Sequence, residues 1–119
     1  MSPLPPPRMT RRIMYIERKE QAREGRGRIG WVEQSSSCRV YRYAGMVLHK
    51  SIRGQYNCFD AGSGELWLIT DPKANGRDKL HGGYVDIDAD AREEYWLRIR
   101  NQPDSVALES FLADPRVTK

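Results

Sequence analysis

The sequence predicts one small α+β domain: a strongly bent antiparallel β-sheet or small barrel of SH3-like size, followed by a C-terminal helix. Three observations predict this fold class. The chain has 119 residues, which is the size of a single domain. Short β-rich segments follow one another closely as far as Ile87, with turn residues between them. After Ile87, the apolar residues Ala91, Tyr95 and Ile99 follow the period of a helix instead.

The first part of the chain is expected to hold seven short strands. Each segment is rich in β-branched or aromatic residues and is bounded by Gly, Pro, Asn or Ser, which favour turns. Ala44-Gly45 predicts a two-residue hairpin turn between two of the strands. The expected strands cover residues 12–18, 29–33, 39–43, 46–51, 56–60, 65–70 and 84–87.

Helical structure is expected only towards the C-terminus. Asp90 followed by Glu93 fits a capping box and predicts a helix that begins at Asp90. Asn101 and Pro103 predict its end. The apolar residues within 105–113 predict a second short helix.

The composition excludes several classes of protein. Apolar residues make up 39% and charged residues 30% of the chain, which is too apolar for a disordered protein. No apolar run approaches the ~18 residues of a membrane span, and the start of the chain has no apolar signal segment. We expect a cytoplasmic protein without a membrane partner. Its expected parts are a disordered proline-rich tail over 1–9, one β-rich domain over 10–103, and a short helix with a C-terminal tail over 104–119.

The net charge of +4 is unevenly distributed. Residues 1–54 carry twelve Lys or Arg and four Asp or Glu, whereas residues 55–119 carry eight and twelve. A basic half can attract nucleic acid or an acidic protein surface. Its charges can equally pair with the acidic half across the fold, and the sequence leaves both interpretations open.

A basic segment precedes the second expected strand. Residues 25–30 have the letters of the dinucleotide-binding motif G-x-G-x-x-G, but a charged loop precedes them and a strand follows, which is the wrong context. We interpret the segment as a flexible loop. Its guanidinium groups at Arg23, Arg26 and Arg28 are candidate phosphate contacts.

The third expected strand mixes basic and aromatic side chains. Arg39, Tyr41, Arg42 and Tyr43 have the residue types that hold single-stranded nucleic acid, with rings stacked on bases and arginines on phosphates. Alternation places Tyr41 and Tyr43 on one face of the strand and Arg42 on the other. If the two tyrosines face the core, this stacking hypothesis fails.

The sequence shows no recognised catalytic or metal signature, and we expect no cofactor. Asp86, Asp88 and Asp90 are spaced as in a calcium loop, but the glycine and glutamate that such a loop needs are missing. The four residues that have zinc-binding side chains lack the paired spacing of zinc modules. They are Cys38, His49, Cys58 and His81. Enzymatic activity stays open, with a non-enzymatic protein favoured.

Tyr95 and Trp96 follow two glutamates on the expected helix, and their rings point about 100° apart. One ring is expected to anchor the helix to the sheet. The other is expected at the edge, where an aromatic side chain suits a partner surface. Both are candidate partner-binding residues.

Four segments carry a family resemblance. They are residues 56–60, 64–67 and 75–80, and the segment 85–96, which ends in Arg-Glu-Glu-Tyr-Trp. At these places the chain resembles a family of small uncharacterised bacterial proteins that end in this helix motif. The resemblance covers about Met9 to Pro103. It implies no activity, cofactor or site residues.

The sequence therefore favours a non-enzymatic module that docks onto a protein partner. Two observations motivate this prediction: the opposed charge of the two halves, and six Tyr and three Trp in so small a chain. The alternative is a nucleic-acid-binding module that uses the loop and strand between Arg23 and Arg42. A third hypothesis is a small metal-dependent enzyme at the carboxylates between Asp86 and Glu94.

Overall fold

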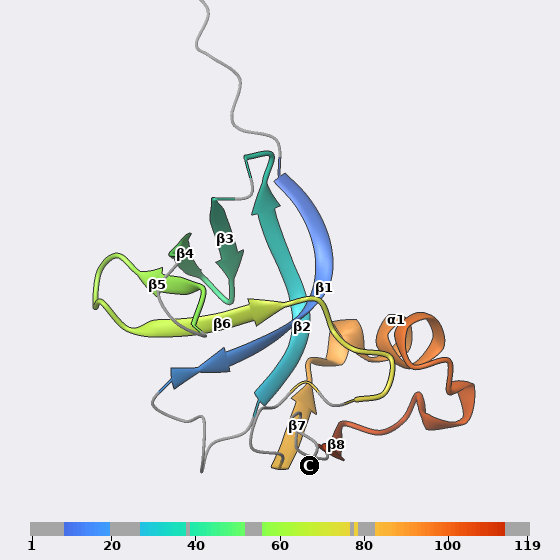
Figure 1. Ribbon diagram of the computed structural model, residues 1–119. Helices are drawn as coiled ribbons and strands as arrows, with labels where there is room; N and C mark the ends of the chain where they lie inside the picture. Colours follow the sequence, from blue (N-terminus) through green and yellow to red (C-terminus); the bar gives the residue numbers. More distant parts are fainter. Residues whose placement is uncertain are drawn as a thin grey trace, which may run out of the picture.

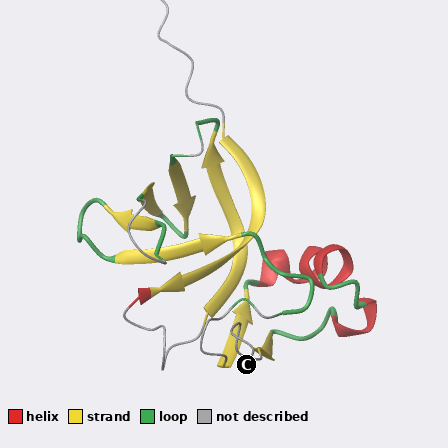
Figure 2. Ribbon diagram, viewed as in Figure 1, coloured by secondary structure: helices red, strands yellow, loops and turns green. Residues whose placement is uncertain are grey.

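The computed structural model describes residues 9–19, 27–37, 39–51, 56–76, 78 and 83–113. Within these residues, eight strands form one sheet, and the first six close into an antiparallel barrel with a short helical segment beside it (Figures 1 and 2). The predicted fold class is confirmed. The barrel strands are β1 (Met9–Arg18), β2 (Gly27–Ser35), β3 (Val40–Tyr43), β4 (Met46–Lys50), β5 (Cys58–Asp60) and β6 (Leu66–Thr70).

The barrel closes because β1 is long enough to pair with two strands. Its residues Met9 to Ile16 pair with β2, and its residues Tyr15 to Arg18 pair with β6. The other pairs join neighbours in the chain, from β2–β3 to β5–β6. β1 bends strongly between its two partners, as Figure 1 shows. This bend leaves no free edge between β1 and β6.

β1 separates two clusters of buried side chains among the described residues. Met14 and Ile16 point into the barrel, whereas Ile13 and Tyr15 point to the opposite side. Alternation along a strand sends neighbouring side chains to opposite faces, so a strand that is apolar on both faces is covered on both. The barrel cluster contains Met14, Ile16, Val32, Tyr41, Tyr43, Leu48, Cys58 and Ile69.

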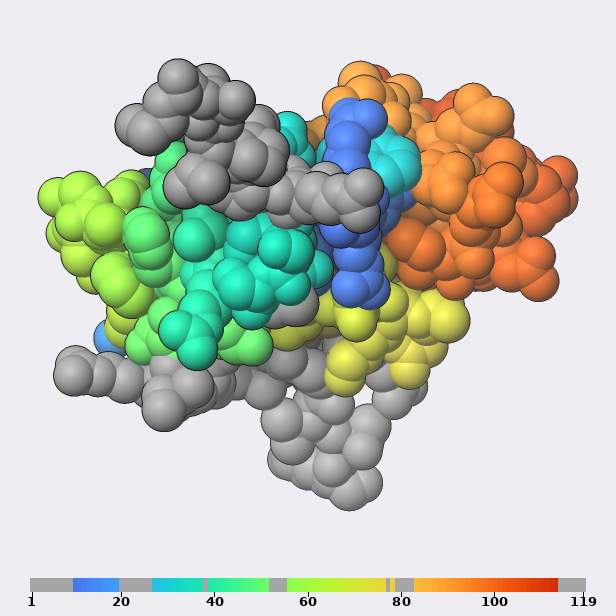
Figure 3. Space-filling model, turned by 90° about the horizontal axis from the view of Figure 1, so that it is seen from above, coloured from blue at the N-terminus to red at the C-terminus, as the bar shows by residue number. Residues whose placement is uncertain are grey.

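The C-terminal part of the chain supplies the cover on the second face. It runs through β7 (Gly83–Ile87), η2 (Ala89–Ala91), α1 (Arg92–Glu94), η3 (Tyr95–Ile99), η4 (Pro103–Ser105) and β8 (Ser110–Ala113). β7 pairs in parallel with the start of β2, and β8 pairs with β7 in antiparallel orientation. In Figure 3, this orange segment lies on one side of β1, and the β3–β5 strands lie on the other. The β3–β5 strands are therefore left uncovered by the C-terminal part.

The prediction of a second helix is wrong, since Ser110 to Ala113 form the strand β8. Phe111 stacks on Tyr95 with ring centroids 5.7 Å apart, and Ser110 lies opposite Asp86 of β7. Pairing with β7 and burial of one face outweigh local helix propensity in a segment this short. For the same reason, the packed structure continues past the expected boundary at residue 103.

The predicted capping box is also absent, because no side chain caps the start of the helical segment. The carboxylate of Asp90 pairs instead with Arg11 at 3.4 Å, and its carbonyl oxygen accepts a hydrogen bond from Trp31 Nε1 at 2.9 Å. Asp90 thereby ties the segment to β1 and β2. The helical segment ends before Asn101, whose φ is +53°, as predicted.

Candidate functional site

Tyr95 and Trp96, the candidate partner-binding residues, are 0% and 2% exposed. The indole of Trp96 donates to the carbonyl oxygen of Leu108 at 3.1 Å, and Phe111 packs against both rings. Burial raises the pKa of Tyr95 to about 12. The expectation that one of these rings lies at the surface is wrong, because Phe111 of β8 packs against both rings.

The tyrosines of β3 face the barrel interior, with Tyr41 5% and Tyr43 7% exposed. The predicted alternation is confirmed, since Arg42 points outwards between them. Bases cannot stack on rings that lie in the core, so the stacking hypothesis fails for Tyr41 and Tyr43. Arg23 and Arg26 lie outside the described residues.

The opposed charges of the two halves pair across the fold. Four arginines of the basic half, which lie on β1 and β2, contact carboxylates of the acidic half. The pairs are Arg11 with Asp90, Arg12 with Asp71, Arg18 with Glu65, and Arg28 with Asp88. Much of the uneven charge distribution is therefore balanced by ion pairs within the fold.

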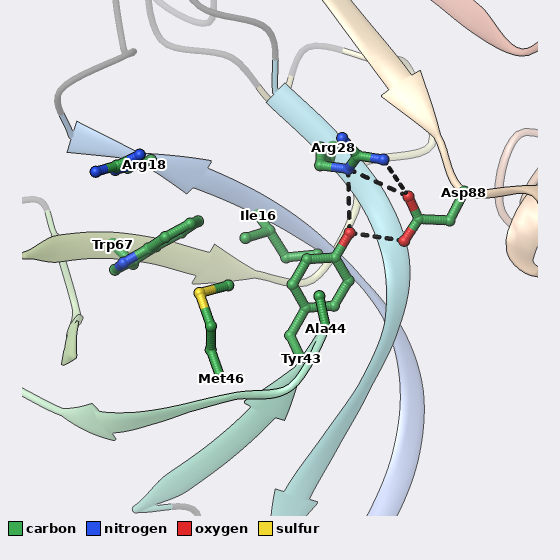
Figure 4. Close-up of a pocket in the computed structure, with 8 residues that line it drawn as sticks. All are labelled: Ile16, Arg18, Arg28, Tyr43, Ala44, Met46, Trp67 and Asp88. Atoms are coloured by element: carbon green, nitrogen blue, oxygen red, sulfur yellow. Dashed lines mark hydrogen bonds and ion pairs between the residues drawn. The ribbon is translucent and has the colours of Figure 1, made fainter. Parts of the chain in front are cut away.

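A cleft of about 430 Å³ opens at one end of the barrel, beside the β3–β4 turn (Figure 4). Ile16 and Met46 lie in the middle of the cleft. Arg18 and Trp67 form one side, and Arg28, Tyr43 and Asp88 form the other. The cleft combines apolar, aromatic and guanidinium groups on a closed barrel. Its lining consists of Ile16, Arg18, Arg28, Tyr43, Ala44, Met46, Trp67 and Asp88.

Arg28, Tyr43 and Asp88 form a closed hydrogen-bond network on one side of the cleft. Tyr43 donates its hydroxyl to Asp88 Oδ2 at 2.6 Å, and Arg28 donates Nη2 to Asp88 Oδ1 at 2.9 Å. Arg28 Nε also donates to the Tyr43 hydroxyl at 3.2 Å. Burial, followed by the bond to Asp88, raises the pKa of Tyr43 well above its ordinary value. The hydrogen bond to Asp88 likewise raises the pKa of Arg28.

This network holds its protons and charges in place. Both oxygens of Asp88 accept hydrogen bonds, and the raised pKa values keep Tyr43 protonated and Arg28 charged. A general acid or base needs a pKa near the working pH, which neither group has. The arrangement suits recognition of a ligand by fixed donors rather than proton transfer to it.

The opposite side of the cleft is formed where β1 and β6 pair, because Arg18 and Trp67 are register partners. The guanidinium carbon of Arg18 lies 6.0 Å from the centroid of the Trp67 ring, and Arg18 also pairs with Glu65. Nε1 of Trp67 is buried and has no hydrogen-bond acceptor in the described part of the chain. Trp67 lines this side of the cleft, as Figure 4 shows.

A second hollow, of about 690 Å³, lies at the other end of the β3–β4 hairpin. Ser35 Oγ fixes its edge by accepting hydrogen bonds from the backbone N–H groups of Arg39 at 3.3 Å and Val40 at 3.1 Å. The lining residues are Ser37, Arg39, Val40, His49, Lys50 and Phe59. Two cations and two rings therefore line this hollow, whereas the guanidinium groups of the cleft are paired with carboxylates.

The remaining sequence hypotheses concern metals and membranes. Residues 9–19, 27–37, 39–51, 56–76, 78 and 83–113 contain no group of three or more His, Cys, Asp or Glu that could hold a metal ion. Cys58 is a buried free thiol, and Cys38 and His81 lie outside these ranges. The helices that the structure describes are too short and polar for any of them to cross a membrane.

Comparisons of the chain with protein-family models, with curated proteins and with solved structures give no match. The family resemblance at the Arg-Glu-Glu-Tyr-Trp motif therefore stays a prediction.

The sequence indicated Arg28, Tyr43 and Asp88 as candidate residues of three different sites, and it gave no such indication for the other residues that line the cleft. Ile16, Met46, Trp67 and Asp88 come from four separate segments, which only barrel closure brings together. One signal was present in the sequence: the run from Ile13 to Ile16 is apolar at every position, which is typical of a strand that is buried on both faces.

Proposed function

We propose that the protein is a non-enzymatic binding module. A segment of a protein partner that has an acidic residue beside an apolar one docks in its cleft. The observation that carries the proposal is the combination of Met46, Trp67 and two arginines in one hollow. Trp, Tyr, Arg and Met are the side chains enriched where protein partners bind most tightly. A closed barrel holds them in place before binding, which lowers the entropic cost of docking.

The guanidinium groups of the lining indicate the chemistry of the partner. Two guanidinium groups line the cleft, and each is paired with one carboxylate, Arg18 with Glu65 and Arg28 with Asp88. The side chain of Arg28 is 54% exposed, and its Nη1 donates to no described residue. A partner carboxylate can therefore bind Arg28 without displacing Asp88. A neighbouring apolar side chain would then lie against Met46 and Trp67.

A selection with a displayed random-peptide library, using the full chain as bait, tests this proposal. We expect enrichment of peptides that place Asp or Glu beside an apolar or aromatic residue. Fluorescence anisotropy measures the affinity of synthetic versions of these peptides. The Met46→Glu variant should bind them at least tenfold more weakly than the wild type, since the new carboxylate repels the acidic residue of the peptide.

Val47→Glu is the matched control, because Val47 is the next residue on β4 and points to the outer surface. It adds the same charge without entering the cleft, so peptide binding should be unchanged. Circular dichroism would establish that both variants are folded. Equal binding to Met46→Glu and Val47→Glu, or enrichment of basic peptides, would refute docking at the cleft.

A further inference from the structure

The cations on the β3–β4 hairpin differ from those on β1 and β2. Within the described part of the chain, the side chains of Arg39, Arg42 and Lys50 form no ion pair and no hydrogen bond. All three are exposed. Their positive charge is therefore available to an external anion, whereas Arg11 and Arg12 are already paired with carboxylates.

Two rings lie side by side on the outer surface of the same strands. His49 of β4 is the register partner of Phe59 of β5 and of Val40 of β3. The centroids of the His49 and Phe59 rings are 5.8 Å apart, and their planes are inclined by 30°. Leu48, the neighbour of His49, points into the barrel, so alternation directs His49 outwards. Both rings are half-buried, which leaves part of their faces open to a ligand.

The three cations lie around this ring pair on two faces of the strands. Arg42 shares the outer face with His49, because both alternate with residues that point into the barrel. Lys50 is the register partner of the buried Cys58, so Lys50 and Arg39 lie on the inner side, at the open end of the barrel beside the hollow. The N–H of Lys50 donates to the carbonyl oxygen of Arg39 at 2.8 Å, which places both residues one position beyond the Val40–His49 pair. Arg42 lies two positions from Val40 in the other direction. At 3.3 Å per residue, Arg39 and Arg42 are separated by about 10 Å along the strand.

We propose that the hollow at the open end of the β3–β4 hairpin, together with the adjoining outer face, binds single-stranded nucleic acid, with bases stacked on His49 and Phe59 and phosphates held by Arg39, Arg42 and Lys50. Single strands are bound by this combination of rings and cations, because every unpaired base has an apolar face and every nucleotide a negative charge. A duplex offers the phosphates alone, since its bases are stacked on one another. The hollow of about 690 Å³ between Arg39, His49, Lys50 and Phe59 can receive an unstacked base.

This inference is independent of the proposed protein docking. The cleft lies beside the turn of the β3–β4 hairpin at Ala44, whereas Arg39 and Lys50 lie at its open end. Met46→Glu, which alters the cleft, should bind nucleic acid as the wild type does. The two proposals can therefore fail separately.

The test is a titration of a short fluorescein-labelled oligothymidine with the full chain, followed by fluorescence anisotropy at several salt concentrations. Three phosphate contacts predict that log K falls with log salt with a slope of about −2, at ~0.7 per contact. Duplex DNA of the same length should compete at least tenfold more weakly than unlabelled single strand.

Two kinds of variant separate charge from stacking. Arg39→Glu should weaken binding and flatten the salt slope by about 0.7 or more, because it removes a phosphate contact and adds repulsion. Lys73→Glu is the matched control: Lys73 is exposed, lies outside this face and forms no ion pair with a described residue. Phe59→Leu should weaken binding about tenfold at an unchanged slope, since it removes a ring and no charge.

Several results would overturn the proposal. Absence of binding at low salt would exclude the site altogether. Equal weakening by Arg39→Glu and Lys73→Glu would show attraction to net charge alone. Equal competition by duplex, or unchanged affinity in Phe59→Leu, would show an anion-binding surface without base stacking. Circular dichroism and thermal melting of each variant would exclude unfolding as the cause of a loss.

Discussion

Gly30 lies directly against the carboxylate of Asp88, and this contact depends on the absence of a side chain. A Cβ built on Gly30 would overlap Asp88 Oδ2 and would lie 2.7 Å from Cε1 of Tyr43. Both neighbours belong to the hydrogen-bond network on the side of the cleft. Gly30 therefore allows β2 to approach closely enough for Arg28, Tyr43 and Asp88 to meet.

Gly30→Ala should lower the free energy of unfolding by about 1–3 kcal/mol, since the methyl group forces Asp88 and Tyr43 apart. Urea denaturation followed by circular dichroism measures the change. Gly62→Ala is the control, because its added Cβ would meet Asp60 Oδ1 at 3.4 Å, an ordinary contact. Equal stability of the two variants would show that Asp88 moves away at no cost.

Tyr43→Phe should lower the free energy of unfolding by about 1–2 kcal/mol, because the carboxylate of Asp88 loses a short hydrogen bond in a half-buried position. A double-mutant cycle with Asp88→Asn measures the coupling between the two side chains. We expect a coupling free energy of about 1 kcal/mol. Strict additivity of the two substitutions would contradict the network that the geometry describes.

Phe111→Ala should destabilise the protein by about 2–3 kcal/mol, since Phe111 packs on the rings of Tyr95 and Trp96. Leu112→Ala, one residue further along β8, should change stability by less than about 0.5 kcal/mol. The side chain of Leu112 is 66% exposed and points away from those rings. Thermal melting of both variants distinguishes a β8 that belongs to the folded unit from one that only lies against it.

The stability of the protein should fall in alkaline solution because of Cys58. Burial raises the pKa of this thiol from 9.0 to about 12. Below pH 9 the thiol is protonated in both states, so its stabilising contribution is fully present. Above pH 9 the unfolded chain loses the proton first, and the free energy of unfolding falls by up to about 1.4 kcal/mol per pH unit. The contribution is lost by about pH 12.

Cys58→Ala tests this dependence, because alanine removes the titrating group. The variant should show a shallower fall in the free energy of unfolding above pH 9, although a small cavity lowers its stability at every pH. Tyr43 and Tyr95 titrate in both proteins and form a common background. Parallel curves for wild type and variant between pH 9 and 10 would exclude the thiol as the cause.

Local sequence patterns determined most of the barrel. The alternation at Val40 to Tyr43 correctly separated inward from outward side chains, and Ala44-Gly45 correctly predicted a hairpin turn. These features depend on residues next to one another in the chain. Backbone geometry then requires alternate side chains to lie on opposite faces, and φ values of +50° and +81° at Ala44 and Gly45 make the turn.

Local patterns were misleading where a distant segment competes with the local one. The residues of β8 have the apolar spacing of a short helix, but the edge of β7 offers them backbone hydrogen bonds and the Tyr95 ring offers Phe111 a partner. One of the two rings, Tyr95 or Trp96, was expected at a surface for the same reason. Whether a ring on a helix is exposed depends on what packs against it.

By itself, the sequence determined the class of the fold, the strands of the barrel and the turns between them. It also determined that Tyr41 and Tyr43 share one face of β3 and that Arg42 lies on the other face. Only the tertiary structure decided which of those two faces is the core, and which distant residues meet. Arg28 and Asp88 are 60 positions apart. The two sides of the cleft come together only when β1 closes the barrel. The physical reason is that side-chain periodicity is a property of a single strand, whereas register, closure and edge pairing are properties of several strands together.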